Sequence, residues 1–162
     1  DNPSQNETNA NETNADNSAQ NDSEPVAEKP KEETFGLNET AVFDNIKVTA
    51  VDLDETKGES YNTADDGKTF VGVKFEIENV SEETQSISTM LLFTPYADDI
   101  KCDESFFGES AFGDDSLGGE LSPGKKMVGW YAVEIPEDWQ KLELEVKSDW
   151  LSDNKAKFVF EK

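Results

Sequence analysis

The side chains with the clearest capacity for chemistry are carboxylates gathered in four short segments, and Asp and Glu oxygens are the ligands that Ca²⁺ prefers. These acids are Asp52, Asp54, Asp65, Asp66, Asp98, Asp99, Asp103, Glu104, Asp114 and Asp115. The segment DLDETKG at 52–58 begins like a calcium loop, but Lys57 stands where an EF-hand has glycine, and no Glu follows at the twelfth position. The segments at 98–104 and 113–116 read as loops that could meet at one end of the fold. Calcium therefore stays open beside the simpler interpretation that these acids are only solvated.

A carboxylate-based hydrolase is the second chemistry to consider, because many glycosidases use two carboxyl groups. The abundance of acids makes any one pair uninformative. The chain has no His, so Ser-His-Asp and Cys-His arrangements cannot form. It also lacks a G-x-S-x-G motif, a complete P-loop and a G-x-G-x-x-G motif. We therefore expect no enzyme, and we predict no catalytic, cofactor-binding or metal-binding residue.

Cys102 is the only cysteine, which excludes an internal disulfide and a Cys-rich zinc site. We expect a half-buried small side chain, with a reactive thiol as the alternative; the sequence does not assign its role.

The charge of the chain restricts its partners. The formal net charge is −23, with no Arg. Nine of the 37 acids and two of the 14 lysines lie in residues 1–34, so 28 acids and 12 lysines give residues 35–162 a net charge of −16. Nucleic acids and anionic lipids are bound through clustered basic side chains. We expect no nucleic-acid partner and a protein or cell-envelope partner instead.

Composition divides the chain into two regions. Residues 1–34 carry the tandem repeat NETNA-NETNA and contain no Leu, Ile, Phe, Tyr or Trp. Such a segment buries too little apolar surface to offset its ordering entropy. We predict a disordered acidic linker over 1–34 and one folded domain over 35–162, and no apolar run is long enough to span a membrane.

The folded region reads as β-structure throughout. The clearest strand is TFVGVKFEIEN at 69–79, where Val71, Val73, Phe75 and Ile77 share one face. Gly72 on its other face indicates a bulge or a close approach. The other predicted strands are 45–53, 85–95 ended by Pro95, 142–146 and 156–162, with one or two short strands among the loops of 98–120.

The stretch LSPGKKMVGWYAVEIP at 121–136 predicts a type II turn followed by a strand. Pro123 and Gly124 occupy the two central positions that this turn favours. Tyr131 and its alternate neighbours then face the core, which leaves Val128, Trp130 and Ala132 on the outer face. We expect the 98–120 segment to cover them; the alternative is an exposed aromatic patch for a partner or glycan.

About seven strands, antiparallel signals at their junctions and no long amphipathic helix favour an all-β fold. We predict an immunoglobulin-like antiparallel β-sandwich, with a barrel as the alternative.

Two motifs carry a resemblance to a known family. GKTFVGVKFEIENVSEE, followed by LSPGKKMVGWYAVEIPED and LELEV, resembles a bacterial extracellular family known as domain of unknown function 4352, over about residues 37–161. The matching positions are Gly67, Lys68, Phe70, Asn79, Leu121, Pro123, Gly124, Gly129 and Pro136. The family also looks similar to a secreted mycobacterial antigen of the same architecture.

The resemblance implies a non-enzymatic module of a Gram-positive surface lipoprotein or secreted protein, with a linker between a lipid-modified Cys and an immunoglobulin-like sandwich. A lipid anchor ahead of Asp1 would then be the only membrane attachment. The family has no established activity, so it supplies no site residues. The expected role is binding to a protein or to the envelope; the alternatives are a calcium-binding structural or adhesive module and, after it, a carboxylate-based hydrolase.

Overall fold

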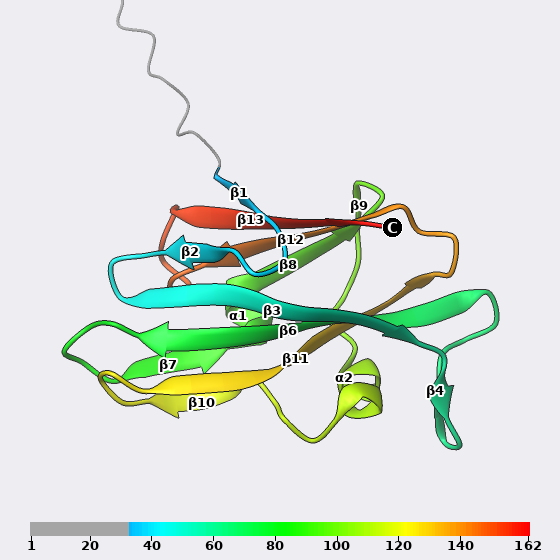
Figure 1. The fold of residues 1–162 in the computed structure, drawn as a ribbon, viewed down its shortest axis with the longest axis horizontal. Helices are drawn as coiled ribbons and strands as arrows, with labels where there is room; N and C mark the ends of the chain where they lie inside the picture. Colours follow the sequence, from blue (N-terminus) through cyan, green and yellow to red (C-terminus); the bar gives the residue numbers. More distant parts are fainter. Residues whose placement is uncertain (1–32) are drawn as a thin grey trace, which may run out of the picture. The chain divides into compact units, whose positions relative to one another are not determined.

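The computed structural model describes residues 33–162, in which two β-sheets pack face to face (Figure 1). The predicted linker, apart from residues 33 and 34, lies outside the described residues. The strands are β1 (Thr34–Phe35), β2 (Thr40–Val42), β3 (Ile46–Thr56), β4 (Gly58–Glu59), β5 (Asn62–Thr63), β6 (Lys68–Asn79), β7 (Gln85–Ser88), β8 (Phe93–Ala97), β9 (Ile100–Lys101), β10 (Gly118–Leu121), β11 (Lys126–Pro136), β12 (Lys141–Lys147) and β13 (Lys155–Glu161). The helices are α1 (Thr89–Leu92) and α2 (Phe106–Phe112).

The two main sheets have the strand orders β1-β13-β12-β8-β9 and β11-β6-β3-β2. Two small ribbons, β10-β7 and β4-β5, extend them. The pairs are antiparallel except β1 with β13, which is parallel. This arrangement confirms the predicted immunoglobulin-like β-sandwich. Within residues 33–162, neither short helix is long and apolar enough to cross a membrane.

Alternation along β6 builds the core between the sheets. Val71, Val73, Phe75 and Ile77 are at most 1% exposed, as their shared face predicts. The ring of Phe75 lies 5.2 Å from Phe93 on β8 and 5.3 Å from the β13 residue Phe158, centroid to centroid. These edge-to-face contacts join the two sheets, because β6 belongs to one sheet and β8 and β13 belong to the other.

The predicted turn before β11 is confirmed. Gly124 has a φ of 70°, which glycine adopts without strain. The backbone N–H of Lys125 donates to the carbonyl of Ser122 at 3.1 Å, which closes the four-residue turn.

The predicted single strand at 85–95 is wrong. The structure breaks it into β7, the helical turn α1 and β8, and β8 continues through Pro95 to Ala97. Pro95 lies opposite Leu144 of β12. It precedes Tyr96 and Ala97, the two β8 residues that pair with the short strand β9. Proline is tolerated at such a position near the sheet edge, where fewer backbone N–H groups are needed for pairing.

The segment 98–120 contains the two short strands β9 and β10 and also the helix α2, which the sequence did not predict. Helix α2 covers the outer face of β6 and β11 (Figure 1). The ring of Phe112 stacks on Trp130 at 5.0 Å, and Trp130 is buried. The expectation that 98–120 covers Trp130 is therefore confirmed, although Val128, nearer the start of β11, remains exposed.

Candidate binding site between the two helices

The acids predicted as cation ligands are dispersed, and several have local partners. Asp52 and Asp54 lie within β3 rather than in a loop, and each accepts a hydrogen bond from the N–H of the next residue. Asp98 accepts the N–H groups of Gln140 and Lys141 at 3.0 and 2.9 Å.

Other acids of these segments pair with lysine: Asp65 with Lys68 at 3.2 Å, Asp99 with Lys141 at 2.5 Å and Asp115 with Lys74 at 3.5 Å. Among the residues that the structure describes, no three Cys, Asp or Glu side chains form a group that could hold a metal ion. The acidic segments thus do not converge, and we propose no calcium site.

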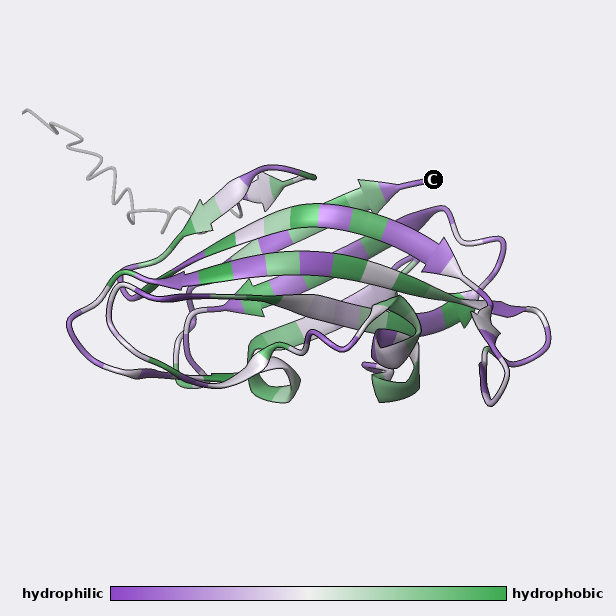
Figure 2. Cartoon of the chain, turned by 60° about the horizontal axis from the view of Figure 1, so that its bottom comes forward, coloured by the Kyte–Doolittle hydropathy of each residue, from purple (hydrophilic) through white to green (hydrophobic). Residues whose placement is uncertain are grey.

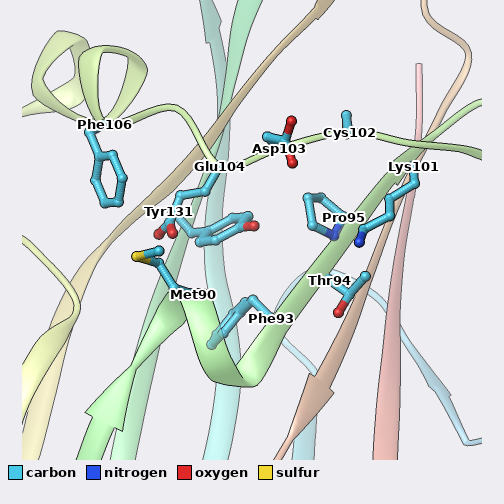
Figure 3. A pocket seen from close by; sticks show the side chains of 10 residues that line it. All are labelled: Met90, Phe93, Thr94, Pro95, Lys101, Cys102, Asp103, Glu104, Phe106 and Tyr131. Atoms are coloured by element: carbon cyan, nitrogen blue, oxygen red, sulfur yellow. The ribbon is translucent and has the colours of Figure 1, made fainter.

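A different site emerges where the two helices lie on the same side of the sandwich (Figure 2). A pocket of about 240 Å³ lies there, below the roughly 300–1,000 Å³ typical of small-molecule sites. Its lining comes from α1, β8, β9, α2, β11 and the segment that links β9 to α2: Met90, Phe93, Thr94, Pro95, Lys101, Cys102, Asp103, Glu104, Phe106 and Tyr131 (Figure 3). This volume matches one inserted side chain better than a drug-sized ligand.

Backbone pairing with β11 positions Glu104 in this pocket. Glu104 forms an isolated antiparallel bridge with Val133, and the N–H of Ser105 donates to the carbonyl of Ala132 at 2.7 Å. Ser105 then caps α2, because its hydroxyl accepts the N–H of Gly108 at 3.0 Å. The chain is thus fixed on both sides of Glu104, so the position of its side chain follows from the strand and the cap.

The carboxylate of Glu104 is buried and without a donor. Both of its oxygens are inaccessible to solvent, and no N–H, hydroxyl or lysine of the described residues donates to either of them. A buried carboxylate that lacks donors is destabilising. A carboxylate in this position is stabilised either by a proton shared with a neighbouring group or by a bound ligand that donates hydrogen bonds to it.

Glu109, from the middle of α2, supplies the nearby proton. Its pKa is raised to about 8, first by burial and then by a hydrogen bond to Glu104 and by the negative charge of that residue. At neutral pH the raised pKa favours a protonated Glu109, whose O–H can then donate to Glu104.

This geometry differs from that of a glycoside hydrolase. Carboxyl pairs in those enzymes are separated by about 5–9.5 Å, which leaves room for the sugar or a water molecule. Here the two carboxyl groups are in hydrogen-bonding contact, and the oxygens of Glu104 are buried. The pair therefore lacks the spacing that the hydrolase alternative requires.

Two other ionisable groups line the pocket in their uncharged forms. Burial raises the pKa of the Cys102 thiol to about 11, and the charge of Asp103 adds to the effect. Burial also raises the pKa of the Tyr131 hydroxyl, and Glu104 is the main charge that contributes. Cys102 is thus a half-buried thiol, as the sequence predicted, and is protonated at neutral pH.

The two helices that contribute to the pocket carry exposed apolar side chains, of which Met90 and Phe106 line it. Met90 and Leu91 of α1 are 72% and 61% exposed, and Phe106 and Phe107 of α2 are 60% and 76% exposed. We call these four residues the helix face. Figure 2 shows the two helices on the same side of the molecule, each with hydrophobic segments. Large apolar side chains gathered at a pocket are typical of an interaction surface.

The sequence identified only part of this site. Glu104 was named, but as a cation ligand beside Asp98 and Asp99, which lie in the β8–β9 turn and do not line the pocket. Glu109 and the helix face were missed because α2 spans only seven residues, too few for a helical period to show. The Ser105 cap was the one local signal for a helix start.

The fold and this site define the chain as a β-sandwich module with a small pocket beneath two short helices. Residues 35–157 match the profile of the family described as "Domain of unknown function (DUF4352)", and the chain belongs to that family. The suspected resemblance is thereby confirmed. No curated protein is significantly similar to the chain in sequence.

Solved bacterial structures share the fold. One is the "putative lipoprotein" ycdA of Bacillus subtilis, with a TM-score of 0.61 and 17% identity; the match covers 75% of this chain and 38% of that one. An uncharacterized β-sandwich protein of Clostridium difficile 630 gives 0.57 and 16%, covering 85% and 99%. The secreted protein MPT63 of Mycobacterium tuberculosis gives 0.57 and 11%, covering 83% and 100%. At these identities the similarity establishes the fold alone.

Proposed function

We propose that this chain is a non-enzymatic, extracellular binding module that docks a protein partner on the helix face. The observation that carries the proposal is the exposure of Met90, Leu91, Phe106 and Phe107, at 60–76%, on two helices that both contribute to the lining of one pocket. Exposed Met and aromatic side chains are enriched at protein interfaces and contribute much of their binding energy.

Charge supports a protein partner over a nucleic acid or an anionic membrane. Residues 35–162 have 28 acids against 12 lysines and no arginine. At least eight of these lysines form ion pairs with acids of the same domain. A surface of this kind repels phosphate, because phosphate binding needs clustered unpaired cations.

An extracellular location is proposed from the relatives and from the chain itself. One structural neighbour is described as a putative lipoprotein and another as a secreted protein. The acidic, Asn-rich segment 1–34 suits a tether that would raise the local concentration of the module at a surface. We propose a Gram-positive surface lipoprotein or secreted protein, anchored by a lipid ahead of Asp1 in the first case.

The absence of enzymatic activity is part of the proposal. The chain has no His to act as a base near neutral pH. The carboxyl groups of Glu104 and Glu109 are in contact, and the oxygens of Glu104 are closed to water. Both points favour recognition over catalysis.

Capture from the native cell envelope tests the docking surface. The full chain, immobilised, is compared with a Leu91→Ser/Phe107→Ser variant, whose two changes lie on the helix face but outside the pocket lining. We expect one envelope protein to be retained by the wild type and lost by the variant.

The matched control is Trp150→Ser/Leu151→Ser, which removes two apolar side chains of similar exposure, 67% and 72%, from the β12–β13 connection. This control is expected to retain the partner. Equal capture by all three proteins, or equal loss in both variants, would count against the helix face as the docking surface.

A further inference from the structure

The pocket contains an unusual combination of groups. Part of its wall is apolar, from Met90, Phe93, Pro95, Phe106 and Tyr131, and one end holds the buried carboxylate of Glu104. Figure 3 shows Met90, Glu104 and Tyr131 converging at that end, with Phe106 pointing toward it from α2. A ligand that fits must therefore combine an apolar stem with a group that satisfies a carboxylate.

We propose that this pocket receives the side chain of a lysine from the docked protein partner, with its ammonium group on Glu104 and its methylene stem along Met90 and Phe106. The proposal rests on the docking function of the helix face and names the chemistry of the partner. It assigns the pocket as a site for an alkylammonium group.

The chemistry of lysine matches both parts of the pocket. A four-carbon stem packs against apolar surface while the ammonium group keeps polar partners. The ammonium has three N–H donors, and the two buried oxygens of Glu104 accept no hydrogen bond from any N–H, hydroxyl or lysine of the described residues. Aromatic faces such as those of Phe93 and Tyr131 also attract cations that approach within about 6 Å.

The charged groups around the pocket favour a cation over other occupants. Glu104 and Asp103 contribute negative charge near Tyr131. An anionic side chain would be repelled, and a purely apolar one would leave Glu104 uncompensated. The pocket has one cation of its own, Lys101, but Figure 3 shows its ammonium group beside Thr94, with Tyr131 between it and Glu104.

Entry of the stem needs only side-chain movement. Phe106 and Met90 lie over the Glu104 end and are 60% and 72% exposed, so both have space to turn outward. Rotamer changes of this kind are common when an interface forms. The net charge of −16 over residues 35–162 would in addition steer a basic partner toward the module.

The test is an NMR titration of the isotope-labelled full chain with blocked lysine, N-acetyl-lysine methylamide, at neutral pH. Two matched probes separate the parts of the ligand: blocked norleucine has the stem without the charge, and ethylamine has the charge without the stem. We expect saturable shifts at Met90, Glu104 and Phe106 with blocked lysine, and at least tenfold weaker binding of both other probes.

Three variants complete the test. Glu104→Gln is expected to weaken blocked-lysine binding at least tenfold. Glu109→Gln, which leaves the charge of Glu104 in place, and Glu120→Gln, at an exposed position on β10, are expected to bind within about threefold of wild type. Circular dichroism of each variant checks that it is folded.

The outcomes separate this inference from the docking function. Equal binding of norleucine, shifts spread over the acidic surface, or binding unaffected by Glu104→Gln would each overturn the lysine site. Partner capture that is lost in Leu91→Ser/Phe107→Ser but kept in Glu104→Gln would leave the docking surface standing and remove the lysine. If blocked lysine binds in a Glu104-dependent way but partner capture does not depend on the helix face, the pocket remains a lysine site and the helix face is removed as the docking surface.

Discussion

The side-chain nitrogen of Asn79 donates a 2.7 Å hydrogen bond to the backbone carbonyl of Leu121, 42 residues further along the chain. The same nitrogen donates to Glu83, and its oxygen accepts from the N–H and hydroxyl of Ser81. The backbone of Asn79 also pairs with Gly124 and Lys125. One fully buried amide therefore joins the end of β6 to the turn before β11, and it links the two motifs that resemble the family.

The first prediction is that Asn79→Ala destabilises the domain by about 2–4 kcal/mol, because it leaves buried carbonyl and N–H groups without partners. Urea denaturation followed by Trp fluorescence measures this loss. Ser81→Ala removes one half-buried hydroxyl of the same network and should cost under about 1 kcal/mol. Similar losses for the two variants would show that Asn79 does not organise the junction.

The second prediction concerns the contact between β6 and α2. A Cβ atom at Gly72 would lie 2.6 Å from the ring of Phe112, so Gly72→Ala must displace that ring and with it α2. We expect a destabilisation of about 1–3 kcal/mol. The fluorescence of Trp130, which stacks on Phe112, should change at the same time.

A double-mutant cycle isolates this contact. In a Phe112→Ala background, Gly72→Ala should cost much less, because the clashing ring is gone. Gly118→Ala is the matched control, since a Cβ there would meet the carbonyl oxygen of Ile87 at an ordinary 3.7 Å. Additive costs in the cycle would show that the ring does not limit the space at Gly72.

The sequence predicted those parts of the fold that depend on local alternation. Strand β6 and the Pro123–Gly124 turn could be identified because side chains alternate strictly in the strand, and because Gly124 accepts a positive φ. The break at α1 could not be identified from the sequence, because the segment around Thr89–Leu92 reads as part of one mostly apolar strand. Only its packing against other strands makes this segment a helical turn.

The candidate site was harder to predict because its parts come from distant segments. Glu104 and Glu109 meet only when α2 folds back over β11, and Met90 arrives from the other side of the pocket. No residue spacing in the sequence indicates that these side chains lie close together. An acidic composition moreover hides one functional carboxyl among 37 acids.

The third prediction is a pH dependence of stability that originates at Glu109. Its pKa is about 8 in the folded protein and 4.5 ordinarily, so between these values the folded state holds a proton that the unfolded state releases. The stabilisation is complete below about pH 4.5 and is lost as the pH rises through 8. The ionisable group that faces Glu109 is Glu104.

Glu109→Gln tests this prediction, because the amide remains neutral and still donates to Glu104. We expect the variant to exceed wild type at pH 9 by on the order of 1 kcal/mol, far less than the full shift implies, since water screens the half-exposed Glu109. The gain should vanish near pH 4. A gain at pH 9 no larger than that of Glu120→Gln, which removes an exposed negative charge from the same acidic domain, would refute the assignment.

The fourth prediction is that Cys102 reacts slowly in the folded protein. Burial raises its pKa from 9.0 to about 11, so the thiolate population at pH 8 falls roughly 100-fold. Alkylation by iodoacetamide, followed by mass spectrometry, should then be about 10–100-fold slower than in the same chain in denaturing guanidinium. Asp103→Asn should speed the reaction slightly, because the Asp103 charge adds to the shift while burial dominates it. A rate equal to that of the unfolded chain would mean that the thiol is open to solvent, and that the wall of the pocket beside Cys102 is not closed as the structure describes it.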